Sequence, residues 1–226
     1  MALLGKAVIA IWSTIDPGML EEHDRWHSVE HFPERLAIPG FMRGRRSVAT
    51  DAAAAAQRFI FYEIESIAVA TSAPYLERLN NPTPWSRKIM AAHSLNRTLC
   101  SVAASEGFGL GAHLLTVRLS PQPGRAEALQ AWLVREVLPA LVRAPAVVGA
   151  HLLQKDSHTT RPLTGEEKLR KGGADASADW IVLVEAYAAQ PLEPVMRETL
   201  AAPSLRERGA ECDLAASYAL AQVATR

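Results

Sequence analysis

The chain repeats itself, and the repeat limits the folds that it can adopt. When residues 7–46 are placed against residues 113–152, at an offset of 106 without a gap, seven positions are identical. The identical pairs are Pro17 and Pro123, Gly18 and Gly124, Glu21 and Glu127, Trp26 and Trp132, Glu30 and Glu136, Pro33 and Pro139, and Pro39 and Pro145. A second match follows at an offset of 122, between residues 59–63 and 181–185. Such self-similarity predicts that one structural unit is built twice.

Hydrophobic patterning predicts the same elements in both copies. In the first copy we expect strands over residues 7–12, 41–49, 59–65 and 95–103, and helices over residues 19–36 and 72–79. In the second copy we expect strands over residues 113–119, 147–154, 180–187 and 213–223, and helices over residues 125–142 and 193–208. Pro33 is expected to kink or end the first helix, because proline removes a backbone donor and clashes one turn back.

These elements predict the domain organisation and the fold class. Each copy has the order βαββαβ, the ferredoxin-like split βαβ unit, whose sheet carries both helices on one face and needs cover on the other. Two fused copies supply that cover for each other. The predicted fold is therefore α+β: two tandem ferredoxin-like βαββαβ repeats packed sheet to sheet as an intramolecular α/β barrel. We place the first repeat at 1–105, a linker at 106–112 and the second repeat at 113–226.

An insertion separates the second and third strands of the second repeat. It covers about residues 156–179 and is polar, with many Gly, Thr and Lys residues. Long polar connections of this kind are often mobile or form flaps over sites. We expect the same of this one.

Composition indicates the class of protein. Lys plus Arg equals Asp plus Glu at 24 each, so no net field favours nucleic acid or a membrane surface as partner. No apolar run reaches the roughly 18 residues of a membrane span, and the N-terminus shows no signal-peptide pattern. Cys100 and Cys212 are unpatterned and expected to be reduced, as in a cytoplasmic protein. A Gly-rich phosphate loop, a nucleophile elbow and a CxxC pair are all missing from the sequence.

One stretch of the first copy concentrates ionisable side chains. On a helix, with about 100° per residue, His23, His27 and His31 share a face with Glu30 and Glu34. The second copy carries apolar residues at the positions equivalent to the three histidines and Glu34, namely Leu129, Leu133, Val137 and Ala140. If the two helices dock alike, the histidines point toward their own sheet; otherwise the first helix is rotated. Because burying polar groups without partners costs about 1–3 kcal/mol each, we favour a cleft that holds water, metal or ligand.

The first functional hypothesis is acid/base catalysis on a small molecule. Imidazole titrates near neutral pH, so His27 or His31 can act as acid or base. Glu30 or Glu34 would orient that histidine. We therefore take His27, His31, Glu34 and Glu30 as catalytic candidates and His23 as a substrate-binding candidate.

Two further hypotheses stay open. One is a metal- or haem-dependent enzyme that uses His23, His27 or His31; residues 27–31 match the H-x-x-E-H pattern of inverted zinc metalloproteases, although the predicted fold is not a peptidase fold. The other is a non-catalytic ligand-binding or oligomer-forming module. An enzyme or a binder needs a ligand-sized cavity beside the histidines, and a pure interaction module does not. The sequence assigns no cofactor and leaves the metal unknown.

Other residues near the predicted site are candidates for substrate binding. Arg45 and Arg46, with Arg43, begin the second strand and can hold a carboxylate. Trp85 and Tyr62 are suited to the wall of an aromatic pocket. Asn81 belongs to an Asn-Asn-Pro break, where asparagine also serves as a turn residue.

Several motifs of the first copy resemble a known superfamily. They are residues 26–36 (WHSVEHFPERL), 38–41 (IPGF), 43–46 (RGRR) and 75–85 (YLERLNNPTPW). They are similar to a poorly characterised bacterial group near the EthD-like families, within the dimeric α/β-barrel superfamily. The resemblance implies two ferredoxin-like units, here within one chain, and a role in degradative or secondary metabolism.

Together, these features predict one working site, in the first copy. We expect it to act on a small cyclic or aromatic carbonyl or carboxylate compound by isomerisation, cyclisation, decarboxylation or a related step. The expected partners are this small molecule and, through exposed strand edges, a second copy in a homodimer.

Overall fold

The computed structural model describes residues 3–159, 163–169 and 179–226, which form two compact units. The N-terminal unit contains residues 4–101, the described part of 156–177, and residues 221–226. The C-terminal unit contains residues 102–155 and 179–220, together with Leu3. The described part of the insertion thus belongs to the unit built from the first repeat. Its remaining residues, 160–162 and 170–178, lie outside the described residues, and with them much of the expected mobile flap.

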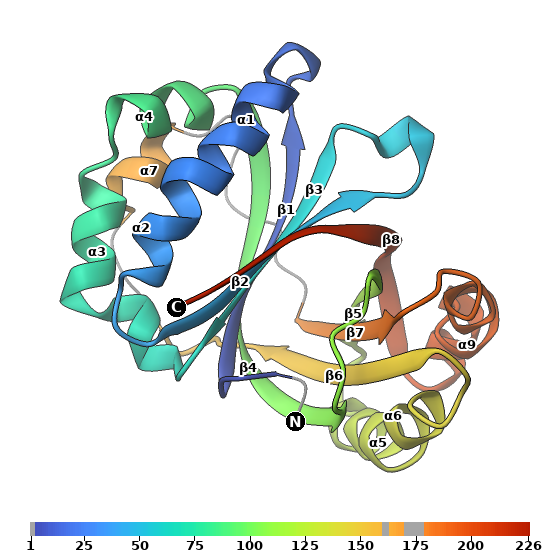
Figure 1. Ribbon diagram of the computed structural model, residues 1–226. Coiled ribbons are helices and arrows are strands. Elements are labelled where there is room, and N and C mark those ends of the chain that lie inside the picture. Colours follow the sequence, from blue (N-terminus) through green and yellow to red (C-terminus); the bar gives the residue numbers. More distant parts are fainter. Residues whose placement is uncertain (1–2, 160–162, 170–178) are drawn as a thin grey trace. The chain divides into compact units, whose positions relative to one another are not determined.

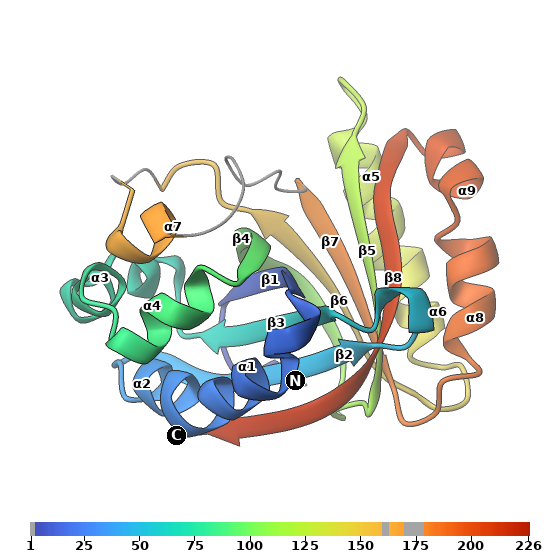
Figure 2. The ribbon, with the colours of Figure 1, turned by 90° about the horizontal axis from the view of Figure 1, so that it is seen from above.

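The N-terminal unit is an antiparallel sheet with helices on one face. β1 (Ala7–Ile15) pairs with β3 (Gln57–Ile64) and with β4 (His93–Gly107), and β3 also pairs with β2 (Phe41–Ala49). The helices are α1 (Leu20–Trp26), η2 (His27–His31), α2 (Phe32–Leu36), α3 (Ala73–Asn80), α4 (Pro84–Met90) and α7 (Gly165–Leu169). Short 3-10 turns are η1 (Pro17–Met19), η3 (Ala52–Ala54) and η4 (Ile67–Thr71). Figures 1 and 2 show the α-helices together on one side of β1–β3.

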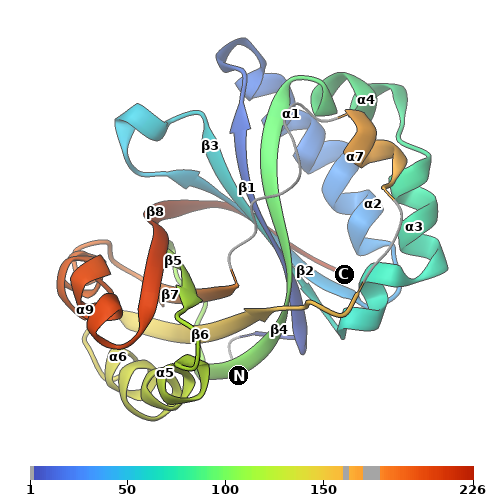
Figure 3. The same ribbon diagram turned by 180° about the vertical axis from the view of Figure 1, so that it is seen from behind.

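The C-terminal unit repeats this plan. β5 (His113–Pro121) pairs with β7 (Trp180–Ala186) and β8 (Ala210–Thr225), and β7 pairs with β6 (Val147–Lys155). Its helices are α5 (Ala126–Trp132), η5 (Leu133–Val137), α6 (Leu138–Leu141), α8 (Leu192–Pro194), η6 (Val195–Thr199) and α9 (Ala202–Glu207). Figure 3 shows α5, α6 and α9 beside its strands.

The eight strands follow the order β1-β3-β2-β8-β5-β7-β6-β4 and form a closed barrel. β4 and β8 each begin in one unit and end in the other, with the change after Ser101 and after Leu220. The predicted α+β fold of two ferredoxin-like repeats in an α/β barrel is confirmed. Among the helices of the described residues, none has the length and apolar character needed to cross a membrane.

The two copies share an unusual feature of the first helix. Both contain a π-helical segment at the same place, η2 over His27–His31 and η5 over Leu133–Val137. In each segment the hydrogen bond spans five residues, from Phe32 N–H to the His27 carbonyl and from Leu138 N–H to the Leu133 carbonyl. A proline follows directly in both copies, at the start of the next α-helical turn, where its missing N–H is tolerated. The first helix therefore continues through Pro33 to Leu36.

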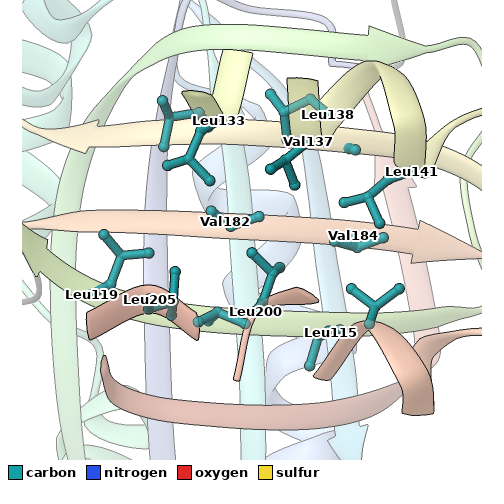
Figure 4. Packing of buried hydrophobic residues seen from close by; sticks show 14 of the residues in the cluster. Leu115, Leu119, Leu133, Val137, Leu138, Leu141, Val182, Val184, Leu200 and Leu205 are labelled. Carbon is teal, nitrogen blue, oxygen red and sulfur yellow. The ribbon is translucent and has the colours of Figure 1, made fainter. Parts of the chain in front are cut away.

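The helix and sheet of the C-terminal unit enclose an aliphatic core. Leu133 and Val137 of η5 are buried with Leu138 and Leu141 of α6 against the sheet, which contributes Leu115, Leu119, Val182 and Val184 (Figure 4). Each of these side chains contributes to stability mainly by leaving water. In this copy the face equivalent to the histidine stripe is a normal hydrophobic core.

Truncating this core is expected to be costly. Leu133→Ala should lower the free energy of unfolding by about 2–5 kcal/mol, because the side chain is fully buried and its removal leaves a cavity. Val29→Ala, at a helix position where the side chain is 63% exposed, should change it by less than about 0.5 kcal/mol. Urea denaturation followed by circular dichroism measures both. Equal losses in the two variants would contradict this account of the core.

Candidate functional site

A cavity of about 40 Å³ lies within the N-terminal unit. Its walls come from α1, η2 and α2 of the first helix, from β1, β2, β3 and β4, and from α3, α4 and α7. The polar lining residues are Ser13, His23, His27, His31, Arg35, Tyr62, Tyr75, His93, Arg97 and Glu166. Most of the lining side chains are buried, whereas Arg97 is half-buried. The site is thus a polar cavity at the place where the C-terminal unit has aliphatic side chains.

The first helix supplies one continuous polar stripe. His23, His27, His31 and Arg35 follow one another at intervals of four residues, and their exposed fractions are 1%, 1%, 7% and 3%. In an α-helix residues four apart drift steadily around the axis, but the wider turn of η2 counteracts this drift. All four side chains therefore line the same cavity. The expectation that both first helices dock alike, with the histidines toward the sheet, agrees with this arrangement.

Among the described residues, His23 is the histidine of the stripe that has a carboxylate partner. Its Nδ1 lies 3.1 Å from Asp24 Oδ1. Asp24 in turn accepts two hydrogen bonds from Arg58, at 3.2 Å from Nε and 3.0 Å from Nη2, and lies 3.6 Å from Arg46 Nε. A neutral His23 that donates from Nδ1 keeps a lone pair on Nε2. That nitrogen is buried and has no hydrogen-bond partner among the described residues.

His27 and His31 carry further unpartnered nitrogens. The Nδ1 atoms of both rings are buried without a hydrogen-bond partner among the described residues, and so is Ser13 Oγ. His27 Nε2 lies 3.4 Å from the Tyr62 hydroxyl, and the two histidine rings are 5.2 Å apart. Because an unmet buried polar atom costs about 1–3 kcal/mol, several around one cavity indicate that water or a ligand occupies it.

Burial sets the charge of these groups. It lowers the pKa of His27 and His31 well below the ordinary value. The charges of His23 and Arg46 lower the pKa of His27 further, and the charge of Arg35 lowers the pKa of His31 further. Burial also lowers the pKa of His23, although the Asp24 hydrogen bond and charge oppose it. Burial raises the pKa of Tyr62, so its hydroxyl stays protonated. At neutral pH the three imidazoles are neutral. The pKa of His23 is lowered less than the pKa values of His27 and His31, so His23 takes up a proton most readily of the three.

A second cluster of charges lies at the Arg35 end of the stripe. Arg35 donates from Nη2 to Glu166 of α7, and both side chains are buried. Burial opposes the charge of Arg35, but the Glu166 carboxylate outweighs it and raises the arginine pKa. Arg97 of β4 donates from Nη2 to the Tyr75 hydroxyl at 3.4 Å. Tyr75 also lies under Arg35, whose guanidinium carbon is 5.8 Å from the ring centre.

The carboxylates of the first helix lie outside the cavity lining. Glu30 accepts hydrogen bonds from Trp26 Nε1, Thr83 Oγ1 and Ser86 Oγ, and so ties the first helix to the start of α4. Glu34 lies 4.0 Å from Arg35 Nη1 and 3.8 Å from Arg78 Nη1, and burial raises its pKa. Neither carboxylate contacts His27 or His31 through a hydrogen bond among the described residues. Asp24 is the carboxylate that orients a histidine here.

The other sequence candidates divide between the cavity and its surroundings. Tyr62 lines the cavity. Arg46 contacts Asp24 and donates to its carbonyl at 2.7 Å, so it supports the His23 pair without lining the cavity. Trp85 is half-buried against Trp26 and α4, outside the cavity lining, with Arg25 5.8 Å over its ring. Asn81 ends α3 and donates from Nδ2 to the Glu77 carbonyl at 3.0 Å.

Arg45 belongs to a separate buried ion pair. It lies 3.2 Å from Glu63, which also binds Arg43 and accepts from Leu4 N–H. The second copy has the counterpart of this pair in His151 and Glu185, 3.3 Å apart. The pair therefore recurs in a unit that lacks the histidine stripe.

Several lining residues had no place in the sequence hypotheses. Arg35 continues the interval of four beyond His31, and His93 and Arg97 alternate along β4, so both patterns were present in the sequence. Asp24 lies outside the cavity lining but contacts His23. Spacing alone does not predict this contact, because adjacent residues of a helix rarely face one another. Glu166 comes from the insertion, and the sequence carries no signal that brings it to this site.

The geometry of the cavity decides whether it can hold a metal ion or a haem. Among the described residues, no group of three or more His, Cys, Asp or Glu is arranged to share a metal ion. The cavity volume of about 40 Å³ is below the roughly 150 Å³ that accommodates one benzene molecule, so a haem does not fit the cavity of this structure. The described residues of this cavity therefore fit neither a metal ion nor a haem.

Comparison with known proteins agrees with the fold. No family model and no curated protein matches the chain. Among solved structures, an anthrone oxidase-like protein is 13% identical with a TM-score of 0.62, covering 100% of this chain and 95% of its own. Chlorite dismutase from Candidatus Nitrospira defluvii, as a variant, is 8% identical with a TM-score of 0.58 and coverages of 96% and 92%. A "putative monooxygenase" from Lactobacillus acidophilus NCFM is 10% identical with a TM-score of 0.57 and coverages of 97% and 96%.

At these identities the likeness shows the fold alone. The structural neighbours are ferredoxin-like α/β-barrel proteins, and this chain has their closed barrel of eight strands. The dimeric α/β-barrel resemblance found in the sequence is therefore confirmed as a fold.

Proposed function

We propose that the N-terminal unit is the active site of a small-molecule enzyme that uses histidine acid/base chemistry on a cyclic or aromatic carbonyl or carboxylate compound. The observation that carries the proposal is the His23–Asp24 pair. His23 Nε2 has no hydrogen-bond partner among the described residues, and the same holds for the Nδ1 atoms of His27 and His31, which line the same cavity. A carboxylate that accepts from Nδ1 fixes the tautomer in which Nε2 is a base, and it stabilises the imidazolium after proton transfer.

The reaction step is the abstraction of a proton beside a carbonyl group. The C–H bond breaks, the proton goes to His23 Nε2, and the electron pair stays on the ligand as an enolate. Return of a proton to a different carbon completes an isomerisation. His27, His31 and the Tyr62 hydroxyl surround the cavity and can donate hydrogen bonds to the ligand oxygen.

The names of the structural neighbours support an enzyme in a general way. An anthrone oxidase-like protein, a chlorite dismutase and a "putative monooxygenase" share this fold, and their names describe reactions of small molecules. A non-catalytic ligand-binding module is the second candidate, favoured by the same buried cavity. Such a module would bind a ligand here without turnover. A homodimer and a cytoplasmic location remain parts of the proposal.

The proposed base is tested by hydrogen exchange. In deuterium oxide, the wild-type protein should catalyse deuterium uptake beside the carbonyl of at least one compound in a panel of small cyclic and aromatic ketones and acids, followed by NMR. His23→Gln should slow the exchange by about 10²–10⁴-fold, because glutamine cannot take the proton. The matched control is His158→Gln, an exposed histidine outside the cavity lining. Exchange at the wild-type rate in His23→Gln would rule out this base. Failure of the wild type to exchange any compound would favour the binding module.

The low pKa values of the buried histidines predict a pH-dependent stability. Above the ordinary pKa of 6.5 the folded and unfolded chains both hold His27 and His31 neutral. Below it the unfolded chain takes up protons that the folded chain does not, so the free energy of unfolding falls as the pH drops from 7 to 5. The slope approaches about 1.4 kcal/mol per pH unit for each such histidine.

Removing two of these histidines should flatten that slope. The double variant His27→Leu/His31→Leu should be as stable as the wild type at pH 7.5 and more stable than it at pH 5, as measured by urea denaturation at both values. His158→Leu serves as the control, because this side chain is exposed and lies outside the cavity lining. A double variant that loses stability with falling pH as steeply as the wild type would contradict the assigned pKa directions.

A further inference from the structure

Arg97 connects the cavity to a second hollow of the N-terminal unit. This outer groove has a volume of about 310 Å³, and its lining includes Arg97, Leu99, Leu163, Asp156 and Glu167. Arg97 lines both the groove and the histidine cavity. The cavity alone is too small for a cyclic compound, whereas cavity and groove together exceed the roughly 150 Å³ that a benzene ring needs. A ligand that occupies both hollows therefore contacts Arg97, which lines each of them.

Among the described residues, Arg97 forms no ion pair with a carboxylate. Its guanidinium contacts the neutral hydroxyl of Tyr75 instead. Arg35 is already neutralised by Glu166. Because the three helix histidines are neutral, Arg97 is the cation of the described cavity lining that has no ion-pair partner among the described residues. A guanidinium in this position attracts one anionic oxygen.

The outer groove limits how much charge the ligand carries. Asp156 accepts from the backbone N–H groups of His158 and Thr159, and Glu167 accepts from Thr164. Both carboxylates disfavour a second negative charge near the groove. Leu163, which is 70% exposed, and the half-buried Leu99 offer apolar contact there. The groove thus combines apolar contacts from Leu99 and Leu163 with two carboxylates, and it suits the part of a ligand that carries no negative charge.

From this arrangement we propose that Arg97 is a specificity-determining residue, which selects substrates that carry a single anionic oxygen, a carboxylate or phenolate, on an apolar body. The inference rests on the proposed function. The anionic oxygen binds the guanidinium where cavity and groove meet, the reacting end enters the histidine cavity, and the apolar body lies in the groove.

Binding of a charged and a neutral probe of the same shape tests this assignment. Isothermal titration calorimetry with 1-naphthoate and 1-naphthamide should show that the wild-type protein prefers the acid. Arg97→Gln should weaken binding of the acid by about tenfold or more and leave binding of the amide within about twofold, because it removes one charge-assisted hydrogen bond. Arg97→Lys should retain part of the preference. Arg143→Gln, an exposed arginine of the C-terminal unit, is the matched control and should bind like the wild type.

Two results would overturn the assignment. One is a wild-type protein that does not prefer the acid, including one that binds neither probe. The other is an Arg97→Gln variant that loses both probes alike while its thermal unfolding is unchanged. If Arg97→Gln itself unfolds, Arg97→Lys and Arg97→Met, which keep the length of the stem, decide by the same comparison.

The binding readout separates this inference from the proposed reaction. His23→Gln should keep the preference for the acid, since its base is not needed for binding. Loss of hydrogen exchange in His23→Gln together with an Arg97-dependent preference supports both proposals. A preference for the acid without any exchange supports Arg97 and rejects the reaction. Exchange without a preference rejects Arg97 alone.

Discussion

The polar half of the N-terminal unit depends on the carboxylate of Asp24. This one group binds His23 from its own helix, holds Arg58 of β3 through two hydrogen bonds and lies near Arg46 of β2. Burial would raise its pKa, but the hydrogen bonds from His23 and Arg58 outweigh that effect and hold it well below its usual value. The carboxylate is therefore charged at neutral pH, and it both neutralises cations on the helix face of the sheet and fixes the proton of His23 on Nδ1. Among the described residues, Asp24 is the carboxylate that pairs with Arg58, and it also accepts the proton of His23 Nδ1.

The internal repeat makes the C-terminal unit a physical control for the N-terminal one. The first helices of both units contain the same π-helical segment followed by proline, and both are docked on an antiparallel sheet. A buried acid–base pair also recurs, as Arg45 with Glu63 and as His151 with Glu185. These shared features belong to the fold. The histidine stripe, Asp24, Arg97 and Glu166 lack counterparts in the aliphatic core around Leu133, so they mark what is particular to the N-terminal unit.

The repeat and the alternation of apolar residues were enough to predict the fold, because a βαββαβ unit leaves one face of its sheet to be covered. The stripe of His23, His27 and His31 was likewise visible from its spacing, and the aliphatic counterparts indicated which way it points. The hydrogen-bond partners of these histidines could not be predicted from the sequence. The spacing places Glu30 and Glu34 on the same helix face as the histidines, yet Glu30 accepts hydrogen bonds from Trp26, Thr83 and Ser86. The carboxylate that contacts a histidine is instead Asp24, which follows His23 in the chain. Glu166 arrives from an insertion, and such long-range contacts depend on the folded chain.

The fold does not need the polar atoms that the N-terminal unit buries. The C-terminal unit fills the same interface between helix and sheet with leucine and valine, which need no partners. At His23, His27 and His31 the N-terminal unit instead keeps nitrogens without a hydrogen-bond partner among the described residues, and each unmet atom costs about 1–3 kcal/mol in the folded state. Local rules of packing are usually broken where a protein works. A ligand that accepts and donates hydrogen bonds in this cavity recovers that free energy on binding, and so the most destabilised part of the helix interface is also the part best prepared to bind.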